Sequence, residues 1–122
     1  SETLMSIGLL DPAYFLYWDD TDWSVRARNA GFRLVYVPEA RIWHKEAVSS
    51  GKKKNPVQEY YVTRNRSWFV MRNGTRLERT VYLLYLMYYL VPFKLGASLL
   101  YHRDPRRYRL FLKGVYDGLF EG

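Results

Sequence analysis

Hydrophobic positions recur at helical spacing in several parts of the chain. The first run is followed by Gly31, a residue that commonly ends a helix, and Asp19 or Asp20 is expected to cap its start. In the third run, Pro92 is expected to interrupt or kink the helix. The predicted helices cover residues 20–30, 57–72, 75–91 and 105–119.

The pattern between the first two helices is extended rather than helical. Residues 33–37 and 40–43 are rich in β-branched and aromatic side chains, and Pro38, which a central strand would not tolerate, separates them. Residues 49–56 (SSGKKKNP) are polar and strongly basic, which predicts a mobile loop. We therefore expect two parts, residues 1–50 with a short β portion and residues 51–122 made of helices.

Charge and aromatic content narrow the class of partner. The net charge of +7 favours polyanions, namely nucleic acid, anionic lipid or phosphorylated substrates. No recognised DNA- or RNA-binding motif accompanies it, so nucleic acid is not the predicted partner. Twelve tyrosines suit boundaries that are half apolar and half wet, and the absence of cysteine excludes disulfides and thiolate metal sites.

One apolar stretch raises the question of a membrane. Residues 80–93 carry no charge but are shorter than the roughly 20 residues that a membrane-spanning helix needs, and extension to Leu100 makes the length borderline. Basic residues flank the stretch, and its tyrosines resemble an interfacial belt. Two interpretations stay open: contact in the plane of a membrane, and a core helix that packs against a further domain.

The segment with the most chemistry is residues 17–23 (YWDDTDW). It places three carboxylates within four residues at the start of a predicted helix, and like charges this close can raise the pKa of one carboxyl and create a general base. Acidic residues are also common in this position as caps and dipole partners. Asp22 and Arg26, four residues apart, can form a structural pair across one turn. His44 is a lone histidine, which is more often packed or exposed than a ligand.

A resemblance to a known family favours functional roles for the acidic segment and His44. Residues 15–26, together with Gly31-Phe32 and residues 38–44 (PEARIWH), resemble the acidic motif and downstream histidine of family 2 inverting glycosyltransferases. Within that family, they resemble bacterial rhamnosyltransferases and galactofuranosyltransferases in particular. Residues 60–65 (YYVTRN) and 113–118 (KGVYDG) are similar to segments in the C-terminal tails of these enzymes.

The resemblance implies a role for each matching residue. Asp20 corresponds to the catalytic base that deprotonates the acceptor hydroxyl, Asp19 would bind or orient the acceptor sugar, and Trp18 would offer a stacking face. His44 corresponds to a ligand of the Mg²⁺ or Mn²⁺ ion that holds the donor diphosphate. Asp20-Thr21-Asp22 has the sequence of an Asp-X-Asp metal motif, but it lies at the start of a helix, which is not where these enzymes carry that motif. Asp22 therefore keeps its structural role.

The resemblance also implies the architecture and setting of the whole enzyme. The intact protein would have the α/β GT-A fold, and this chain would be its C-terminal portion, mostly helical and inactive alone because the half that binds the nucleotide-sugar donor is absent. The acceptor would be a saccharide or lipid-linked saccharide, at the cytoplasmic face of the cell membrane. Exposed half-domain surface predicts oligomerisation. The alternative is a basic, tyrosine-rich membrane-surface module without catalysis.

Overall fold

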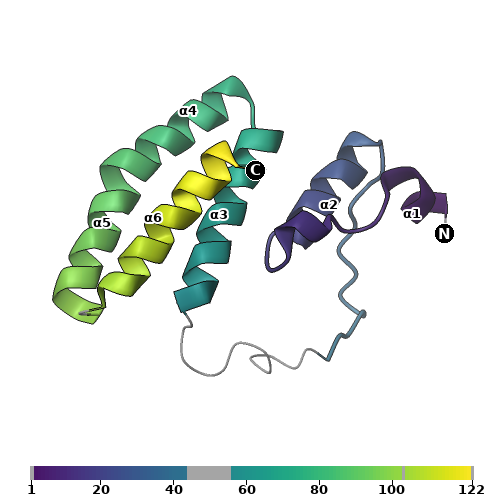
Figure 1. Cartoon of the computed structure of the whole chain (residues 1–122). Coiled ribbons are helices and arrows are strands. Elements are labelled where there is room, and N and C mark those ends of the chain that lie inside the picture. The colour runs from purple at the N-terminus through teal and green to yellow at the C-terminus, as the bar shows by residue number, and fades with distance from the viewer. Residues whose placement is uncertain (1, 44–55, 103, 122) are drawn as a thin grey trace. The chain divides into compact units, whose positions relative to one another are not determined.

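The chain forms two compact units that divide between Lys54 and Asn55 (Figure 1). The computed structural model describes residues 2–43, 56–102 and 104–121, and helices make up most of these residues taken together. The prediction of a mostly α-helical chain is therefore confirmed. The predicted basic loop at 49–56 lies outside the described residues except for Pro56, which begins a helix.

The first unit contains two helices and a single 3₁₀ turn in its described part. These are α1 (Glu2–Ile7), η1 (Pro12–Tyr14) and α2 (Asp19–Asn29). The predicted first helix is present, but neither Asp19 nor Asp20 is its N-cap; Trp18 holds that position and makes no capping hydrogen bond through its side chain. The aspartates instead occupy the first turn, where the positive end of the helix dipole favours negative charge. Gly31, with φ of +87°, follows the helix as predicted.

The two strands expected after α2 do not form within residues 32–43. A turn joins them as expected, because the Ala40 amide donates to the Val37 carbonyl at 3.1 Å across Pro38. However, a strand needs a partner for its backbone groups, and no described segment pairs with this one. Its apolar side chains are correspondingly exposed, with Ile42 at 88% and Trp43 at 94%.

The second unit is built from three long helical segments. They are α3; a continuous helix from Arg76 to Tyr101 that comprises α4, η2, α5 and most of η3; and α6. Their bounds are α3 (Pro56–Asn73), α4 (Arg76–Tyr85), η2 (Leu86–Leu90), α5 (Val91–Gly96), η3 (Ala97–His102) and α6 (Pro105–Phe120).

Of the two outcomes expected at Pro92, an interruption or a kink, the interruption is wrong because the helix continues through the proline. The reason lies in the turn before it. Proline lacks an amide proton, and its ring clashes with the carbonyl four residues earlier in a regular α-helix. Here the chain widens into the π-helix η2, in which the Val91 amide donates to the carbonyl of Leu86, five residues back. The wider turn lets the helix continue through the proline. At its start, Thr75 and Glu78 form a capping box.

Helices α3 and α6 approach each other closely because two glycines face α3. A Cβ atom on Gly114 would lie 2.7 Å from the backbone oxygen of Tyr60. A Cβ atom on Gly118 would lie 2.3 Å from the backbone oxygen of Arg64 and 2.8 Å from the Cβ of Ser67. No side chain fits at either position, so the two backbones pack directly against each other.

The apolar core of the second unit centres on Phe111, about one helical turn before Gly114 on α6. Phe111 is buried against Leu86 and Leu90 of η2, and partly buried apolar residues surround them. A polar contact joins α3 to α4, because the hydroxyls of Ser67 on α3 and Tyr82 on α4 are 2.8 Å apart. Helix α6 therefore presents glycines to α3 and an aromatic ring to η2.

We expect Gly118→Ala to lower the free energy of unfolding of the second unit by about 1–3 kcal/mol, because the new methyl group must push α6 away from α3. Gly96→Ala is the matched control: it is also helical, nothing lies within 4 Å of its Cβ, and alanine favours a helix by up to about 1 kcal/mol. Urea denaturation followed by circular dichroism measures both. Equal stability of the two variants would contradict the close packing.

Candidate active site

The turn that leads into α2 holds an unusual backbone. Phe15, Tyr17 and Trp18 have φ angles of 57°, 66° and 71°, in a region that residues other than glycine rarely adopt. Such conformations cost on the order of 1–3 kcal/mol each, and they persist where surrounding contacts enforce them, often at functional sites. These residues lead directly into α2, which has Asp19 and Asp20 in its first turn.

A buried ion pair between Asp22 and Arg26 stabilises this turn. Asp22 has no exposed surface; its Oδ1 accepts a hydrogen bond from the Tyr14 hydroxyl at 3.1 Å, and its Oδ2 accepts one from Arg26 Nε at 2.9 Å. Tyr14 is itself fully buried at the end of η1. Both oxygens of Asp22 are thus committed to holding η1 against α2, which is a structural role.

The same arginine also ties the N-terminal segment to α2. Arg26 Nη1 donates to the Ile7 carbonyl at 2.7 Å, and Nη2 donates to the Leu9 carbonyl at 2.8 Å. Trp23 Nε1 donates to the Gly8 carbonyl between them at 2.9 Å. These carbonyls lie where α1 ends and would otherwise lack helical partners. The pairing of Asp22 with Arg26 is therefore one part of a larger cluster, rather than an isolated surface pair.

The remaining two carboxylates of the acidic segment are accessible. Asp20 is exposed, and its Oδ1 accepts hydrogen bonds from the Thr21 amide at 2.7 Å and the Thr21 hydroxyl at 3.3 Å. Among the described residues, nothing donates to its Oδ2. Asp19 and Trp18 are half-buried beside it. The structure thus brings Trp18, Asp19 and Asp20 together at one end of α2, where a carboxylate oxygen is available to accept a proton from a bound hydroxyl.

A divalent metal finds no complete ligand set in the part of the chain that the structure describes. No group of three histidine, aspartate or glutamate side chains there converges on one point. Asp22 cannot serve, because both of its oxygens are engaged. His44, the predicted ligand, lies outside the described residues.

The two tail segments named in the sequence analysis meet in the second unit. The Tyr60 hydroxyl and Lys113 Nζ both donate to Asp117 Oδ2 at 2.5 Å. Burial alone would raise the pKa of the Asp117 carboxyl, but the hydrogen bonds from Lys113 and Tyr60 hold it below the ordinary value. Burial, then the bond to Asp117, raises the pKa of the Tyr60 hydroxyl. The cluster fixes α6 on α3 with an ionised aspartate.

Sequence reasoning did not anticipate this cluster, since 57 residues separate its partners. A signal was nevertheless present. Gly114 and Gly118 are four residues apart, as are Thr63 and Ser67, and small residues at that spacing form the stripe that lets two helices pack closely.

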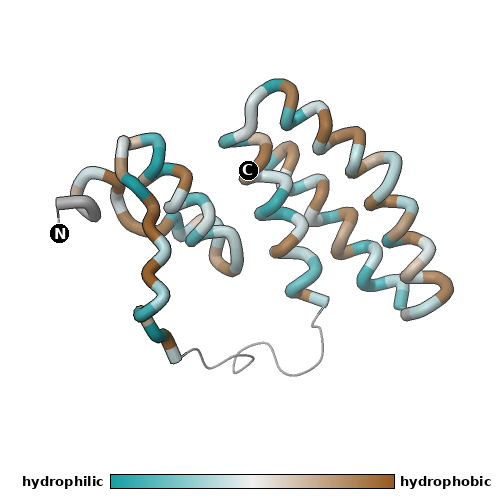
Figure 2. The backbone as a smooth tube through the Cα atoms, turned by 180° about the vertical axis from the view of Figure 1, so that it is seen from behind, coloured by the Kyte–Doolittle hydropathy of each residue, from teal (hydrophilic) through white to brown (hydrophobic). Residues whose placement is uncertain are grey.

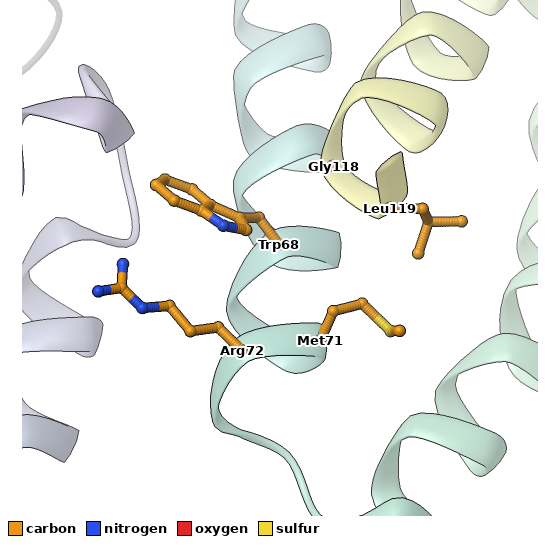
Figure 3. A pocket seen from close by; sticks show the side chains of 5 residues that line it. All are labelled: Trp68, Met71, Arg72, Gly118 and Leu119. Atoms are coloured by element: carbon orange, nitrogen blue, oxygen red, sulfur yellow. The ribbon is translucent and has the colours of Figure 1, made fainter. Parts of the chain in front are cut away.

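A pocket of about 510 Å³ lies near the C-terminal end of α6 (Figure 3). Trp68 and Arg72 project from α3 on the same side, and the guanidinium groups of Arg64 and Arg72 lie over the Trp68 ring at 5.3 and 5.6 Å from its centroid. The lining residues are Trp68, Met71, Arg72, Gly118 and Leu119. None of them carries a carboxylate, so this pocket supplies no general base.

Comparison with known proteins gives one line of relationship. The chain is 41% identical over 46 residues to N-acetylglucosaminyl-diphospho-decaprenol L-rhamnosyltransferase from Mycobacterium tuberculosis, in strains CDC 1551 / Oshkosh and ATCC 25618 / H37Rv. The match covers 38% of this chain and 15% of the length of those relatives. No protein family matches the chain, and no solved structure matches it. The chain therefore has a partial relationship to a glycosyltransferase.

We expect Asp22→Ala to destabilise the first unit by about 2–4 kcal/mol, because it leaves the Arg26 guanidinium and the Tyr14 hydroxyl without their shared acceptor. Asp20→Ala, which removes a carboxylate of the same helix turn from an exposed position, should change stability by less than about 1 kcal/mol. Hydrogen exchange at the amides of α2 measures both effects. Similar protection in the two variants would show that the buried pair does not hold the unit together.

Proposed function

We propose that this chain contributes the acceptor side of an inverting glycosyltransferase, with Asp20 as the general base. The observation that carries the proposal is the geometry at the start of α2. A strained turn precedes two accessible carboxylates, Asp19 and Asp20, in one helical turn, while the third, Asp22, is buried in a structural ion pair. Two further points support it. The partial relative is a rhamnosyltransferase, and the acidic segment resembles that of family 2 enzymes.

Asp20 is favoured over its two neighbours on the basis of its contacts. Asp22 has no exposed surface and both of its oxygens are occupied. Asp19 is half-buried and makes no side-chain hydrogen bond to the described residues, which suits a group that binds the acceptor sugar. Asp20 is exposed and anchored through one oxygen to Thr21, so its position is fixed while the other oxygen can meet a substrate.

The proposed reaction requires one proton acceptor on this side. The acceptor hydroxyl gives its proton to an oxygen of Asp20 as its own oxygen bonds to the anomeric carbon of the donor sugar. The bond from that carbon to the nucleoside diphosphate breaks on the opposite face, and the leaving group keeps the electron pair, so the anomeric configuration inverts. Trp18 offers an aromatic face on which the acceptor ring can stack.

The donor, acceptor and location complete the proposal. The donor is a nucleotide sugar, bound mainly by a part of the enzyme outside these 122 residues, so the chain alone is expected to transfer nothing. The name of the relative suggests an acceptor saccharide carried on a lipid diphosphate, and we propose that the enzyme acts on it at the cytoplasmic face of the membrane. A Mg²⁺ or Mn²⁺ ion would neutralise the diphosphate, but the described residues supply no ligand set for it, so no step above passes through the ion.

We expect Asp20→Asn in the full-length enzyme to lower kcat by a factor of about 10²–10⁴ while the affinity for the donor stays unchanged. Asparagine removes the base but its side-chain oxygen can still accept the Thr21 amide, so the start of α2 should survive the change. Transfer assays with a panel of nucleotide sugars, together with donor-binding measurements, check this expectation.

Asp19→Asn is the control, because it removes the same charge one residue away. We expect it to raise KM for the acceptor more than it lowers kcat. If Asp20→Asn keeps full activity, the Asp20 carboxylate only stabilises the first turn of α2. That result would favour the alternative, a membrane-surface module without catalysis. If donor binding falls together with kcat, the change has damaged the fold rather than the base.

A further inference from the structure

The continuous helix from Arg76 to Tyr101 exposes an apolar face to its surroundings. The helix is 26 residues long, is apolar enough to cross a membrane, and has only 17% of its most apolar window buried. Figure 2, in which brown marks hydrophobic residues, shows brown stretches along α4 and α5. From residue 81 to residue 101, each exposed position is apolar or a tyrosine. Those residues are Val81, Leu84, Tyr85, Met87, Tyr88, Tyr89, Pro92, Phe93, Leu95, Leu99, Leu100 and Tyr101.

The single charge within residues 80–101 is turned away from that face. Lys94 is half-buried, and its ammonium group forms an ion pair with the carboxylate of Glu59 on α3. Its ammonium group also lies 5.9 Å from the centroid of the Phe111 ring on α6. The lysine is therefore neutralised on the inner side of the helix, and the outer side carries no charge.

Three hydroxyl groups of the same helix also find partners within the protein. The Thr80 hydroxyl donates to the Arg76 carbonyl at 2.9 Å, and the buried Ser98 hydroxyl donates to the Asp104 carbonyl at 2.9 Å. The Tyr82 hydroxyl contacts Ser67 on α3. These three hydroxyls can enter an apolar medium at little cost because they are already hydrogen-bonded. The exposed tyrosines combine an apolar ring with a polar hydroxyl, which suits the headgroup region of a membrane interface.

The charge of the second unit indicates which apolar environment this face would enter. Residues 55–122 contain eleven Lys and Arg and five Asp and Glu, a net charge of +6 out of +7 for the whole chain. Exposed arginines lie at both ends of the apolar helix, at Arg76 and at Arg106 on the following helix. An apolar face with exposed tyrosines and basic ends matches the interface of a bilayer that contains anionic lipids.

The packing of the unit decides how the helix meets the bilayer. A helix of 26 residues is about 39 Å long, enough to cross a hydrocarbon core of about 30 Å. However, α3 and α6 lie alongside it, and both carry several charged side chains that hydrocarbon would not accept. A three-helix unit with one apolar helix and two charged ones can lie on a bilayer but cannot be threaded through it.

We propose that the second unit docks on an anionic lipid bilayer through the exposed face of the helix from Arg76 to Tyr101, which lies in the plane of the membrane interface. Tyr88, which is 77% exposed, belongs to the part that enters the interface. The proposal does not depend on the proposed reaction, because the docking face does not include any residue at the start of α2.

The chain has no cysteine, so single introduced thiols report their own surroundings. A polarity-sensitive fluorophore attached at Tyr88→Cys should shift to the blue when phosphatidylglycerol vesicles are added to the 122-residue chain. The same fluorophore at Arg109→Cys, an exposed position on α6, should keep its emission in water. A blue shift at position 88 before vesicles are added, with a dimer by light scattering, would show instead that a second copy covers the face.

Insertion across the bilayer is tested with the ends of the helix. Thiols at Arg76→Cys and Arg106→Cys should both react with an impermeant reagent added outside the vesicles. Protection of one of them would mean that the helix spans the membrane and would overturn the in-plane arrangement.

A charge placed in the face measures its contribution to docking. Tyr88→Asp should weaken partition into phosphatidylglycerol vesicles by about tenfold or more. Tyr36→Asp, which makes the same change at an exposed tyrosine of the first unit, should alter partition far less. Both variants should keep their helical circular dichroism, since both side chains are exposed. Equal partition of the two variants would show that net charge, and not this face, holds the chain on lipid. Asp20→Asn should partition like the parent chain, so failure to dock and failure of the proposed reaction are separate results.

Discussion

The buried contact between Asp22 and Arg26 is the constraint on which the geometry of the first unit depends. A carboxylate without exposed surface is costly unless every oxygen is satisfied, and here Tyr14 and Arg26 satisfy both. Since Arg26 also binds the carbonyls that end α1, a single charged pair fixes the N-terminal segment, η1 and α2 together. The strained backbone before α2 can persist because this cluster holds the segments on either side of it.

The cluster separates two tasks within one acidic segment. Three aspartates in four positions would repel each other if all were equally exposed, but one is neutralised inside by an arginine. The other two stay at the surface, at the end of α2 where the helix dipole favours their charge. In the proposed enzyme, the inner aspartate positions the outer ones, and the outer ones meet the substrate.

The second unit relies on a different kind of close contact. Gly114 and Gly118 allow α6 to touch the backbone of α3, and Tyr60 and Lys113 hold the ionised Asp117 at the same interface. With its polar contacts concentrated there, and with the ion pair of Lys94 turned inward, the unit leaves the outer face of its apolar helix uncharged. The unit thus combines an apolar core and a buried polar contact with a largely exposed apolar helix, and this exposure suits the proposed docking on a bilayer.

The sequence predicted the helices well and the contacts between them less well. Periodicity located α2, α3 and α6, because their apolar spacing and their flanking Gly31 and Pro105 are local signals. Pro92 was expected to interrupt or kink its helix, but a π turn lets the helix continue through it, and that adjustment depends on backbone geometry that composition does not record. The strands expected at 33–37 and 40–43 were wrong, because β-propensity does not supply a pairing partner.

In the candidate site too, features set by neighbouring residues were predictable from the sequence, and contacts between distant residues were not. The acidic segment and the spacing of Asp22 and Arg26 were evident from the sequence. The burial of Asp22 was not, since it depends on Tyr14 and on the carbonyls of Ile7 and Leu9, which lie far along the chain. Nor was the contact between Tyr60 and Asp117, across 57 residues.

The distance between Asp20 and the acceptor hydroxyl in the full-length enzyme tests most directly whether Asp20 is the base. A crystal structure with a nucleotide-sugar analogue and an acceptor would measure it. If Asp20 is the base, the attacking hydroxyl lies within about 3 Å of an Asp20 carboxylate oxygen, with Asp22 still bound to Arg26. An acceptor hydroxyl that contacts a different carboxylate, with Asp20 facing only Thr21 and solvent, would contradict it.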